Sequence, residues 1–449
     1  MAVSQSEKSR SAVEAGWHVS RYNLYAPIPG EDRVAAVSLY RGVCAAYSPM
    51  ELYFLAHLEL LPEGHPLVAR FAEKGLIANF DEREALTAMG RLGCNQSGTI
   101  TLTICPTMGC NFDCPYCFEK HTAGRMSREV QDQVVGLAER MMNAGRARRL
   151  NVVWFGGEPL LAPDVIRDLS ARLIALAEEK GAAYTAGIIT NGYLLTRENA
   201  EMLGNARVGW AQVTLDGMRE NHDQTRHLAG GGPTFDRIIR NLREVSIPFP
   251  VIIRQNVHNG NRKDMRPLCE LILKLKEESG NRLGYYPSAV FDSDAAEERG
   301  KQVPLLCGGG AGDLDLLKGT VDFQPCQGLY CGSGNLWTVS VDDKGRLSKC
   351  SDDVGNPAHS FGSAADWDPL RPLETASAPE FLVRYLNAAH LDDPECRDCV
   401  WLPRCRGGCP YERLFRKKAC LSYRDQPEEY VLSLYKRMKE EAQDAERQA

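Results

Sequence analysis

The chain has 449 residues, of which 43% are hydrophobic and 25% charged, as in an ordinary globular protein of two or three domains. Its 53 basic and 59 acidic residues give a net charge of -6, so there is no basic surplus of the kind that binds nucleic acid or anionic membranes. The N-terminal residues form no apolar signal segment, and no apolar run reaches about eighteen residues. We therefore expect a cytoplasmic protein without a membrane span.

The first 95 residues predict a small α+β module. Residues 21–25 and 33–40 flank a Pro-Gly turn, which indicates a hairpin. Apolar residues then recur at helical spacing in 50–60 and 66–73, followed by a turn and a short strand in 74–80. Such a module either binds a peptide by adding a strand to its edge or covers the end of the next domain.

Strands and helices alternate from residue 96 to about residue 300, which predicts an α/β fold with a parallel sheet. Six strand–helix units are too few to close an eight-stranded barrel, so we expect a partial, TIM-like (β/α)6 barrel. In such barrels the chemistry lies on loops after the carboxyl ends of the strands. The expected strands are 99–107, 150–156, 184–190, 208–215, 251–257 and 283–290, and the expected helices are 127–144, 162–180, 197–204, 234–245 and 263–279.

The chain has sixteen cysteines, which either form disulfides, bind metal or react. In a chain without a secretory signal, metal binding is favoured over disulfides. Cys110, Cys114 and Cys117 follow the first expected barrel strand, with three and two residues between them. Thiolates hold iron–sulfur clusters, and three ligands on a four-iron cluster leave one iron open. An open metal position is how a metal site does chemistry.

Polar residues and glycines follow the next expected strands. Gly156 and Gly157 let a ligand approach the backbone closely, and Glu158 can accept from a ligand ammonium. Further candidates at strand ends are Thr190, Asn191, Thr214, Asp216, Arg226, Arg254 and Asn256. Each of these, taken singly, is equally well explained as strand-end packing or a cap.

Together, the three-cysteine loop and these strand ends, in this order, resemble the radical S-adenosylmethionine (radical SAM) superfamily. The resemblance implies that the open iron is chelated by S-adenosylmethionine, which one electron cleaves to methionine and a 5′-deoxyadenosyl radical that takes hydrogen from a substrate. It also implies cluster ligands at Cys110, Cys114 and Cys117. The implied cofactor contacts are Gly156, Gly157, Glu158, Thr190, Asn191, Thr214 and Arg254.

Eight further cysteines, from Cys326 to Cys420, lie after a linker, residues 301–325, and before a helix-prone tail, 426–449. Thirteen residues lie between Cys331 and Gly345, and four lie between Gly345 and Cys350. The next four cysteines, from Cys396 to Cys409, have two, five and three residues between them, and Cys420 is the last. Residues 326–425 thereby resemble the SPASM domain, which implies two auxiliary 4Fe-4S clusters and three clusters in all. The implied ligands are Cys326, Cys331, Cys350 and Cys409 for the first auxiliary cluster and Cys396, Cys399, Cys405 and Cys420 for the second.

Two points in this region stay open. The role of Cys326 varies among relatives, and without it one iron of the first auxiliary cluster would be open to substrate. A zinc ribbon built from Cys396, Cys399, Cys405 and Cys409 is the alternative explanation for the later cysteines.

Enzymes with this two-part layout include maturases of ribosomally made peptides and anaerobic sulfatase-maturing enzymes. In the latter an aspartate directly follows the cysteine that corresponds to Cys350, whereas here that position is Ser351, followed by Asp352 and Asp353. We therefore expect a peptide maturase that forms thioether crosslinks in a precursor peptide with a leader, reduced by a flavodoxin or ferredoxin. The alternatives are formylglycine formation in a sulfatase and, in another class, a non-catalytic zinc-binding protein.

Overall fold

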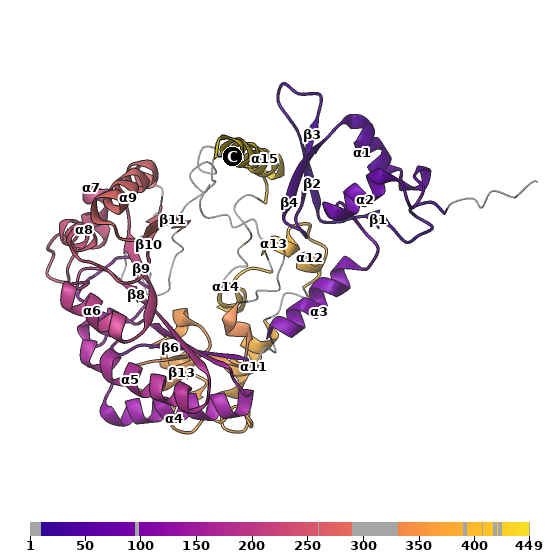
Figure 1. The fold of residues 1–449 in the computed structure, drawn as a ribbon. Coiled ribbons are helices and arrows are strands. Elements are labelled where there is room, and N and C mark those ends of the chain that lie inside the picture. Colours follow the sequence, from indigo (N-terminus) through magenta and orange to yellow (C-terminus); the bar gives the residue numbers. More distant parts are fainter. Residues whose placement is uncertain are drawn as a thin grey trace, which may run out of the picture. The chain divides into compact units, whose positions relative to one another are not determined.

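The computed structural model describes residues 10–94, 98–258, 260–289, 331–388, 393–405, 407–415, 420 and 424–448 (Figure 1). These residues form two compact units. One contains the described residues from Cys94 to 289 together with 331–388, and the other joins the N-terminal residues to those from 393 onward. Cys326 and the expected linker 301–325 lie outside the described residues. No helix in the described part is long and apolar enough to cross a bilayer.

The first unit is built on a nine-stranded sheet with the order β11-β10-β9-β8-β7-β6-β12-β13-β14. All pairs from β6 to β11 are parallel, as predicted, and the sheet between these strands is curved (Figure 1). The six predicted strands are all present. Their bounds are Thr99–Ile104 (β6), Arg149–Trp154 (β7), Ala183–Thr190 (β8), Val208–Leu215 (β9), Val251–Val257 (β10) and Leu283–Ala289 (β11).

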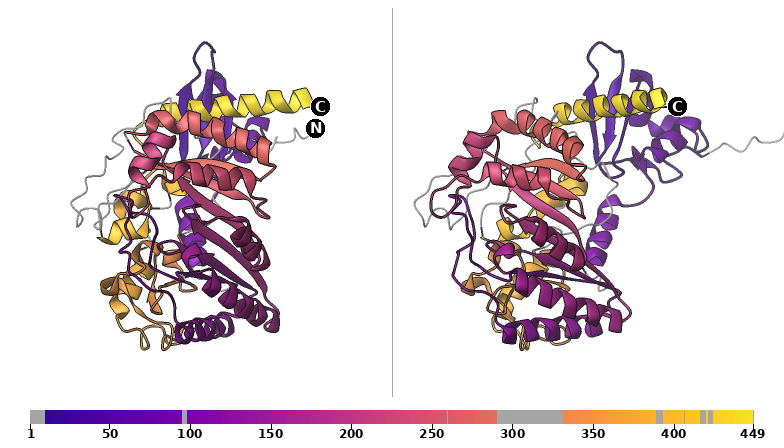
Figure 2. Two further views of the ribbon diagram at one scale, coloured as in Figure 1. Left: turned by 90° about the vertical axis from the view of Figure 1, so that its left-hand side faces the viewer. Right: turned by 60° about the vertical axis from the view of Figure 1, so that its left-hand side comes forward.

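Helices cover one face of this curved sheet (Figure 2). Alternate strand residues such as Ile100, Leu102 and Ile104 face these helices and are fully buried, because successive side chains of a strand point to opposite faces. The five predicted helices are present, together with a short helix, α7, that the sequence did not reveal. Their bounds are Arg128–Gly145 (α4), Pro163–Glu179 (α5), Arg197–Asn205 (α6), Arg219–Thr225 (α7), Phe235–Glu244 (α8) and Met265–Ser279 (α9).

Residues of the cysteine-rich region extend the same sheet. β12 (Thr338–Val341) lies parallel to β6, on the side opposite β7, and β13 (Arg346–Ser348) and β14 (Gly362–Ser363) continue antiparallel from it. The helix α11 (Pro379–Asn387) follows. Strands of four, three and two residues are too short to show a periodic pattern, which is why the sequence did not predict them.

The second unit has an antiparallel sheet with the order β2-β3-β4, formed by Asn23–Pro27, Val34–Ser38 and Val43–Tyr47. The predicted hairpin is β2–β3, and β4 is an additional strand. One face of the sheet packs with apolar residues of α1 and α2, and the other packs on α15. The remaining bounds are His18–Val19 (β1), Pro49–Ala56 (α1), Pro66–Glu73 (α2), Ile77–Ala78 (β5), Glu82–Cys94 (α3), Pro394–Arg397 (α12), Leu402–Cys405 (α13), Pro410–Phe415 (α14) and Pro427–Gln448 (α15).

One glycine of the barrel sheet offers a test of its packing. A Cβ on Gly187 of β8 would lie 2.1 Å from Cε2 of Trp210, its partner on β9, so Gly187→Ala must displace that ring. We expect a loss of about 1–3 kcal/mol of unfolding free energy from this overpacking, read as a lower urea midpoint. Gly284→Ala in β11 is the matched control, because a Cβ there meets nothing within 4 Å. Equal midpoints for the two variants would contradict the packing described.

Candidate iron–sulfur and cofactor site

The three-cysteine loop begins where β6 ends and is fastened to the loop that follows α7. Phe112 forms an isolated β-bridge with Leu228, and the Asp113 amide donates to the His227 carbonyl at 3.1 Å. The Phe112 side chain is buried and meets the ring of Tyr193 with centroids 5.9 Å apart. The loop is therefore anchored beyond the carboxyl end of β6, where the barrel rule predicted the chemistry, and it carries Cys110, Cys114 and Cys117.

Burial controls the charge of these thiols. Burial and the nearby Glu158 carboxylate raise the pKa of Cys110 to about 12. Burial, Glu119 and Cys114 raise the pKa of Cys117. Because burial disfavours a charged form, thiolates at these positions need a compensating cation. Cationic iron supplies that charge, so the three sulfurs fit a cluster as ligands.

The glycines after β7 are required by the cysteine loop itself. A Cβ on Gly156, whose φ is +115°, would lie 2.4 Å from the Thr107 carbonyl oxygen, and one on Gly157 would lie 2.3 Å from the Gly109 carbonyl oxygen. The Glu158 amide donates to that same Gly109 oxygen at 2.9 Å. The sequence predicts that these two glycines leave room for a ligand. In the structure the backbone that approaches them is that of the neighbouring loop, because consecutive parallel strands end side by side.

Glu158 is a fully buried carboxylate that ties the ends of β7 and β8 together. Its Oε1 accepts from the Thr190 hydroxyl at 2.7 Å and the Leu160 amide at 3.0 Å, and its Oε2 accepts from the Asn191 amide at 2.7 Å. Asn191 in turn donates to Asn111 of the cysteine loop at 2.8 Å. Burial raises the pKa of Glu158 while these donors lower it. Oε2 retains one lone pair, which fits the predicted acceptance from an ammonium group.

The Tyr116 hydroxyl links the cysteine loop to the ends of β9 and β10. It donates to Asp216 Oδ2 at 2.6 Å and accepts from Arg226 Nη1 at 2.8 Å and from Asn256 Nδ2 at 3.3 Å. Asp216 and Asn256, which the sequence singled out as strand-end candidates, are thus brought together by one tyrosine between two of the cysteines.

Polar atoms beside this tyrosine indicate a ligand site. Thr214 and Arg254 are register partners on β9 and β10. Several buried donors and acceptors around them have no hydrogen-bond partner among the described residues, although buried polar groups are normally paired. A polar ligand at the ends of β9 and β10 would satisfy them. These atoms are Asp216 Oδ1, Arg226 Nε, Arg254 Nε, Asn256 Oδ1 and His258 Nε2.

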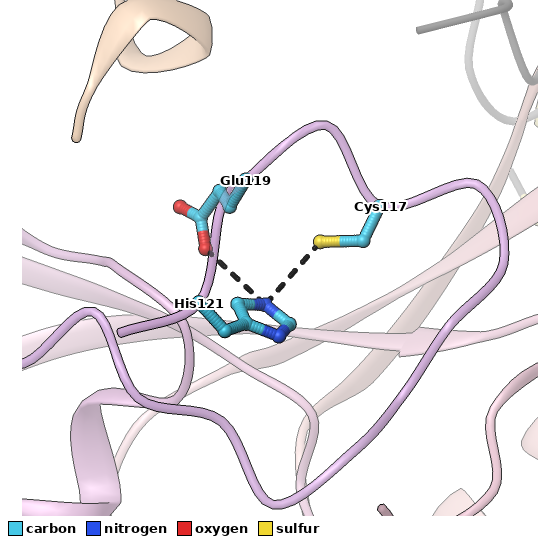
Figure 3. A group of neighbouring side chains, drawn as sticks. All are labelled: Cys117, Glu119 and His121. Carbon is cyan, nitrogen blue, oxygen red and sulfur yellow. Dashed lines mark hydrogen bonds and ion pairs between the residues drawn. The ribbon is translucent and has the colours of Figure 1, made fainter. Parts of the chain in front are cut away.

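Two side chains that the sequence analysis did not single out adjoin the last cysteine (Figure 3). His121 Nε2 lies 3.5 Å from Cys117 Sγ and 4.0 Å from Glu119 Oε2, and the three ligand atoms are close enough together to hold a metal ion. Burial and then Asp352 raise the pKa of Glu119 to about 8. Since Cys117 belongs to the three-cysteine loop, the His121 imidazole is placed to donate a hydrogen bond to the Cys117 sulfur when that sulfur binds a cluster. The sequence signal that could have revealed Glu119 and His121 is that Cys117, Glu119 and His121 occupy alternate positions.

The first auxiliary set is described only in part. Burial raises the pKa of Cys350, and Asp352, Asp353 and Cys331 add to the shift, so Cys331 and Cys350 lie near each other in the first unit. Cys409 belongs to the second unit. Cys326, as noted, is not among the described residues.

A buried lysine stands beside these two cysteines. Lys349 Nζ donates to the carbonyl of Asn335 at 2.6 Å and to that of Thr338. Burial lowers the pKa of Lys349 to about 7, and the nearby Cys331 and Cys350 oppose the shift. The residue joins the turn that carries Cys331 to the strand end that carries Cys350.

The second auxiliary set lies within one unit. Burial raises the pKa of Cys405, and charges on the three other cysteines of the set raise it further, so each of these thiols lies near that of Cys405. Two arginines donate to two of these sulfurs. The four cysteines are Cys396, Cys399, Cys405 and Cys420.

Residues 104–272 match the Radical SAM superfamily, so the chain contains a radical SAM domain, the catalytic domain of a superfamily of enzymes. Fe-coproporphyrin III synthase of Methanosarcina barkeri is 29% identical over 181 residues, which are 40% of this chain and 42% of that protein. The sporulation killing factor maturation protein SkfB of Bacillus subtilis is 24% identical over 172 residues, which are 38% and 39% of the two chains. This chain thus spans less than half the length of these relatives.

The fold resembles that of a solved protein, native anSMEcpe with bound AdoMet and Cp18Cys peptide. The TM-score is 0.54 at 20% sequence identity, and the match covers 77% of this chain and 99% of the other. At this identity the likeness concerns the fold, an α/β partial barrel with the additional strands described above.

The contact between the glycines and the cysteine loop can be tested with Gly157→Ala. The added Cβ would collide with the Gly109 backbone and displace the loop. We expect the variant to lose most of the iron bound at this loop, about four of about twelve irons for a protein with three clusters, as measured by anaerobic iron and sulfide analysis. Gly98→Ala, before β6, should keep full iron because a Cβ there meets nothing within 4 Å.

The hydroxyl of Tyr116 can be removed without changing the ring. Tyr116→Phe removes the acceptor of buried Arg226 Nη1 and one of the two hydroxyl donors to buried Asp216 Oδ2, the other being Thr225. This loss should cost about 1–3 kcal/mol of unfolding free energy, measured by urea denaturation. Tyr193→Phe serves as the control, because the Tyr193 hydroxyl makes no hydrogen bond within the described residues. A Tyr116→Phe variant as stable as the control would mean that the hydroxyl does not link the strands.

Proposed function

We propose that this protein is a radical SAM peptide maturase that takes hydrogen from a ribosomally synthesised precursor peptide and forms thioether crosslinks in it. The carrying observation is the three-cysteine loop held against Gly156, Gly157 and Glu158 inside the radical SAM domain. When bound at this loop, a 4Fe-4S cluster would supply the electron that cleaves S-adenosylmethionine to methionine and a 5′-deoxyadenosyl radical. Cys110, Cys114 and Cys117 would hold that cluster.

The strand ends provide the groups that would orient S-adenosylmethionine. Glu158 Oε2, with the backbone at Gly156 and Gly157, would accept from the methionine ammonium. Thr190 and Asn191 hold Glu158 in place. Thr214 and Arg254 lie at the ends of β9 and β10 together with the polar atoms that have no partner among the described residues. These polar atoms would form hydrogen bonds with the carboxylate and the ribose of the cofactor.

Two auxiliary 4Fe-4S clusters belong to the same proposal. The convergence of Cys396, Cys399, Cys405 and Cys420 supports the second. The proximity of Cys331 and Cys350 supports the first, with Cys409 and Cys326 as its further ligands. Four thiolates per cluster would leave no iron open to the substrate. These clusters would therefore transfer electrons and would not bind the substrate.

A peptide is the proposed substrate, although the radical SAM domain alone does not decide this. The relative from Methanosarcina barkeri is named for a porphyrin product, and its match is confined to 181 residues. SkfB is by name a maturation protein for a killing factor, and the solved anSMEcpe structure holds a peptide beside AdoMet. The larger match, to the peptide-bound structure, includes most of the chain.

The N-terminal module supplies an edge where a leader peptide would bind. β2 and β4 are the outer strands of its sheet, and each pairs only with β3 among the described strands. β2 ends in Pro27, which lacks an N–H for a ladder, whereas β4 (Val43–Tyr47) contains no proline. β4 is therefore the better edge for an added strand. The role as a cover for the next domain is the other possibility for this module.

Formylglycine formation in a sulfatase is the second candidate, and one observation favours it. Asp353 is buried and its carboxylate is occupied by Tyr385 and by His359 Nδ1 at 2.6 Å, so it is unavailable as a base. Asp352 is half-buried and is close enough to Glu119 to raise its pKa. The loop thus presents Asp352 to the cysteine loop, although it lies one position later than the sulfatase pattern requires.

The radical-forming role predicts the effect of replacing Cys110, Cys114 and Cys117 by alanine. The variant should lose S-adenosylmethionine cleavage entirely and retain about eight of about twelve irons, because the two auxiliary clusters remain. Chromatography of 5′-deoxyadenosine and iron analysis measure the two effects. Cleavage that survives the triple change would refute the assignment, and zinc in place of iron in the unaltered protein would favour the zinc-binding class.

The substrate is identified by mass. Reconstituted protein is incubated with dithionite, S-adenosylmethionine and precursor peptides encoded by neighbouring genes, because each thioether crosslink removes two hydrogens and lowers the mass by about two units. Replacing dithionite by flavodoxin or ferredoxin tests the proposed reductant. The maturase proposal would be replaced by formylglycine formation if the protein converts a sulfatase peptide and changes no precursor peptide. In that case Asp352→Ala should abolish the conversion.

A further inference from the structure

Arg413 on α14 is fixed against one cysteine of the second auxiliary set. Its Nη1 donates to Cys396 Sγ at 3.3 Å and to the Gly407 carbonyl at 3.2 Å, while Nη2 donates to Asp393 Oδ2 at 2.7 Å. The side chain is 15% exposed. A guanidinium held by three partners keeps its charge in one place, since it remains protonated throughout the physiological range.

Asp393 couples this arginine to the backbone that carries Cys396. Its Oδ1 accepts from the amides of Glu395 and Cys396 at the start of α12, at 3.0 and 3.3 Å. Its Oδ2 forms the ion pair with Arg413. One carboxylate thus positions both the thiol and the cation that donates to it.

A second arginine repeats the contact on another member of the set. Arg424 Nη1 donates to Cys420 Sγ at 3.0 Å. Arg424 is exposed, and Cys420, Cys399 and then Asp425 are the negative charges that act on it. Two of the four sulfurs therefore receive a hydrogen bond from a permanent cation.

Hydrogen bonds to ligand sulfurs and nearby positive charge stabilise the more negative, reduced state of an iron–sulfur cluster. We propose that Arg413 and Arg424 are positioning residues that raise the reduction potential of the second auxiliary centre. The inference rests on the proposed function in one respect, that Cys396, Cys399, Cys405 and Cys420 are cluster ligands. With these donors the centre accepts an electron more readily than the same four thiolates would without them.

The test isolates the second centre in the full-length chain. Alanine replaces the cysteines of the other two sets, and the reconstituted protein should hold about four irons. Its midpoint potential is then measured by redox titration followed by electron paramagnetic resonance. A background protein that binds no iron would refute the ligand assignment, which is part of the proposed function. The failure of the proposed function can thus be distinguished from the failure of the inference about the arginines. The replaced residues are Cys110, Cys114, Cys117, Cys326, Cys331, Cys350 and Cys409.

In this background, Arg413→Gln and Arg424→Gln should each lower the reduction equilibrium constant about tenfold, a shift of about 59 mV to more negative potential for one electron. Arg397→Gln is the matched control, because Arg397 lies on α12 one residue from Cys396 and, among the described residues, forms an ion pair only with Asp398. Arg413→Lys keeps the charge and should recover part of the shift.

If Arg413→Gln loses its iron through misfolding, the exposed Arg424→Gln carries the test alone. Potentials equal to that of Arg397→Gln in every arginine variant that retains iron would overturn the proposal. A shift in these variants and none in the control would support it.

Discussion

The close contact between two neighbouring strand ends is the constraint on which the candidate site depends. The carbonyls of Thr107 and Gly109 approach the backbone of Gly156 and Gly157 so closely that no side chain fits between them. The Glu158 amide then fixes the loop to β7 through the Gly109 oxygen. A loop of three cysteines without regular structure thereby acquires one fixed position relative to the sheet. The ligands are preorganised by backbone contacts, which cost no side-chain entropy.

Buried carboxylates and hydroxyls extend this arrangement across the sheet. Glu158 joins the ends of β7 and β8, and Tyr116 joins the cysteine loop to β9 and β10. The donors and acceptors in these networks lie at the ends of β7, β8, β9 and β10 and on the cysteine loop, so a shift in one strand would disturb the others. Parallel order makes this possible, since all carboxyl ends meet at one edge of the sheet.

The sequence was sufficient for the barrel because its strands and helices are long enough to show their periods. All six strands from β6 to β11 and the helices α4, α5, α6, α8 and α9 were predicted within a few residues. β12 was not, because its partner β6 lies more than two hundred residues earlier and four residues carry no period. β4 was missed because its alanines have little preference for strands.

The site was predictable at its cysteines and less so around them. Spacing alone singled out the thiols, whereas Glu119 and His121 gain their meaning from where the loop folds back. The approach of the cysteine loop to Gly156 and Gly157 was not predictable either, since a sequence does not show which chain segment lies against a glycine.

The pairing of β12 with β6 has a consequence for how this protein can be divided or recombined. β6, which leads into the cysteine loop, is an interior strand with hydrogen-bonded neighbours on both sides. A chain ending before residue 331 would expose one whole ladder of β6 N–H and C=O groups, the kind of open edge that promotes aggregation. The cysteine-rich region is therefore not an appendage that can be exchanged freely, and its first strands are part of the barrel's own protection against self-association.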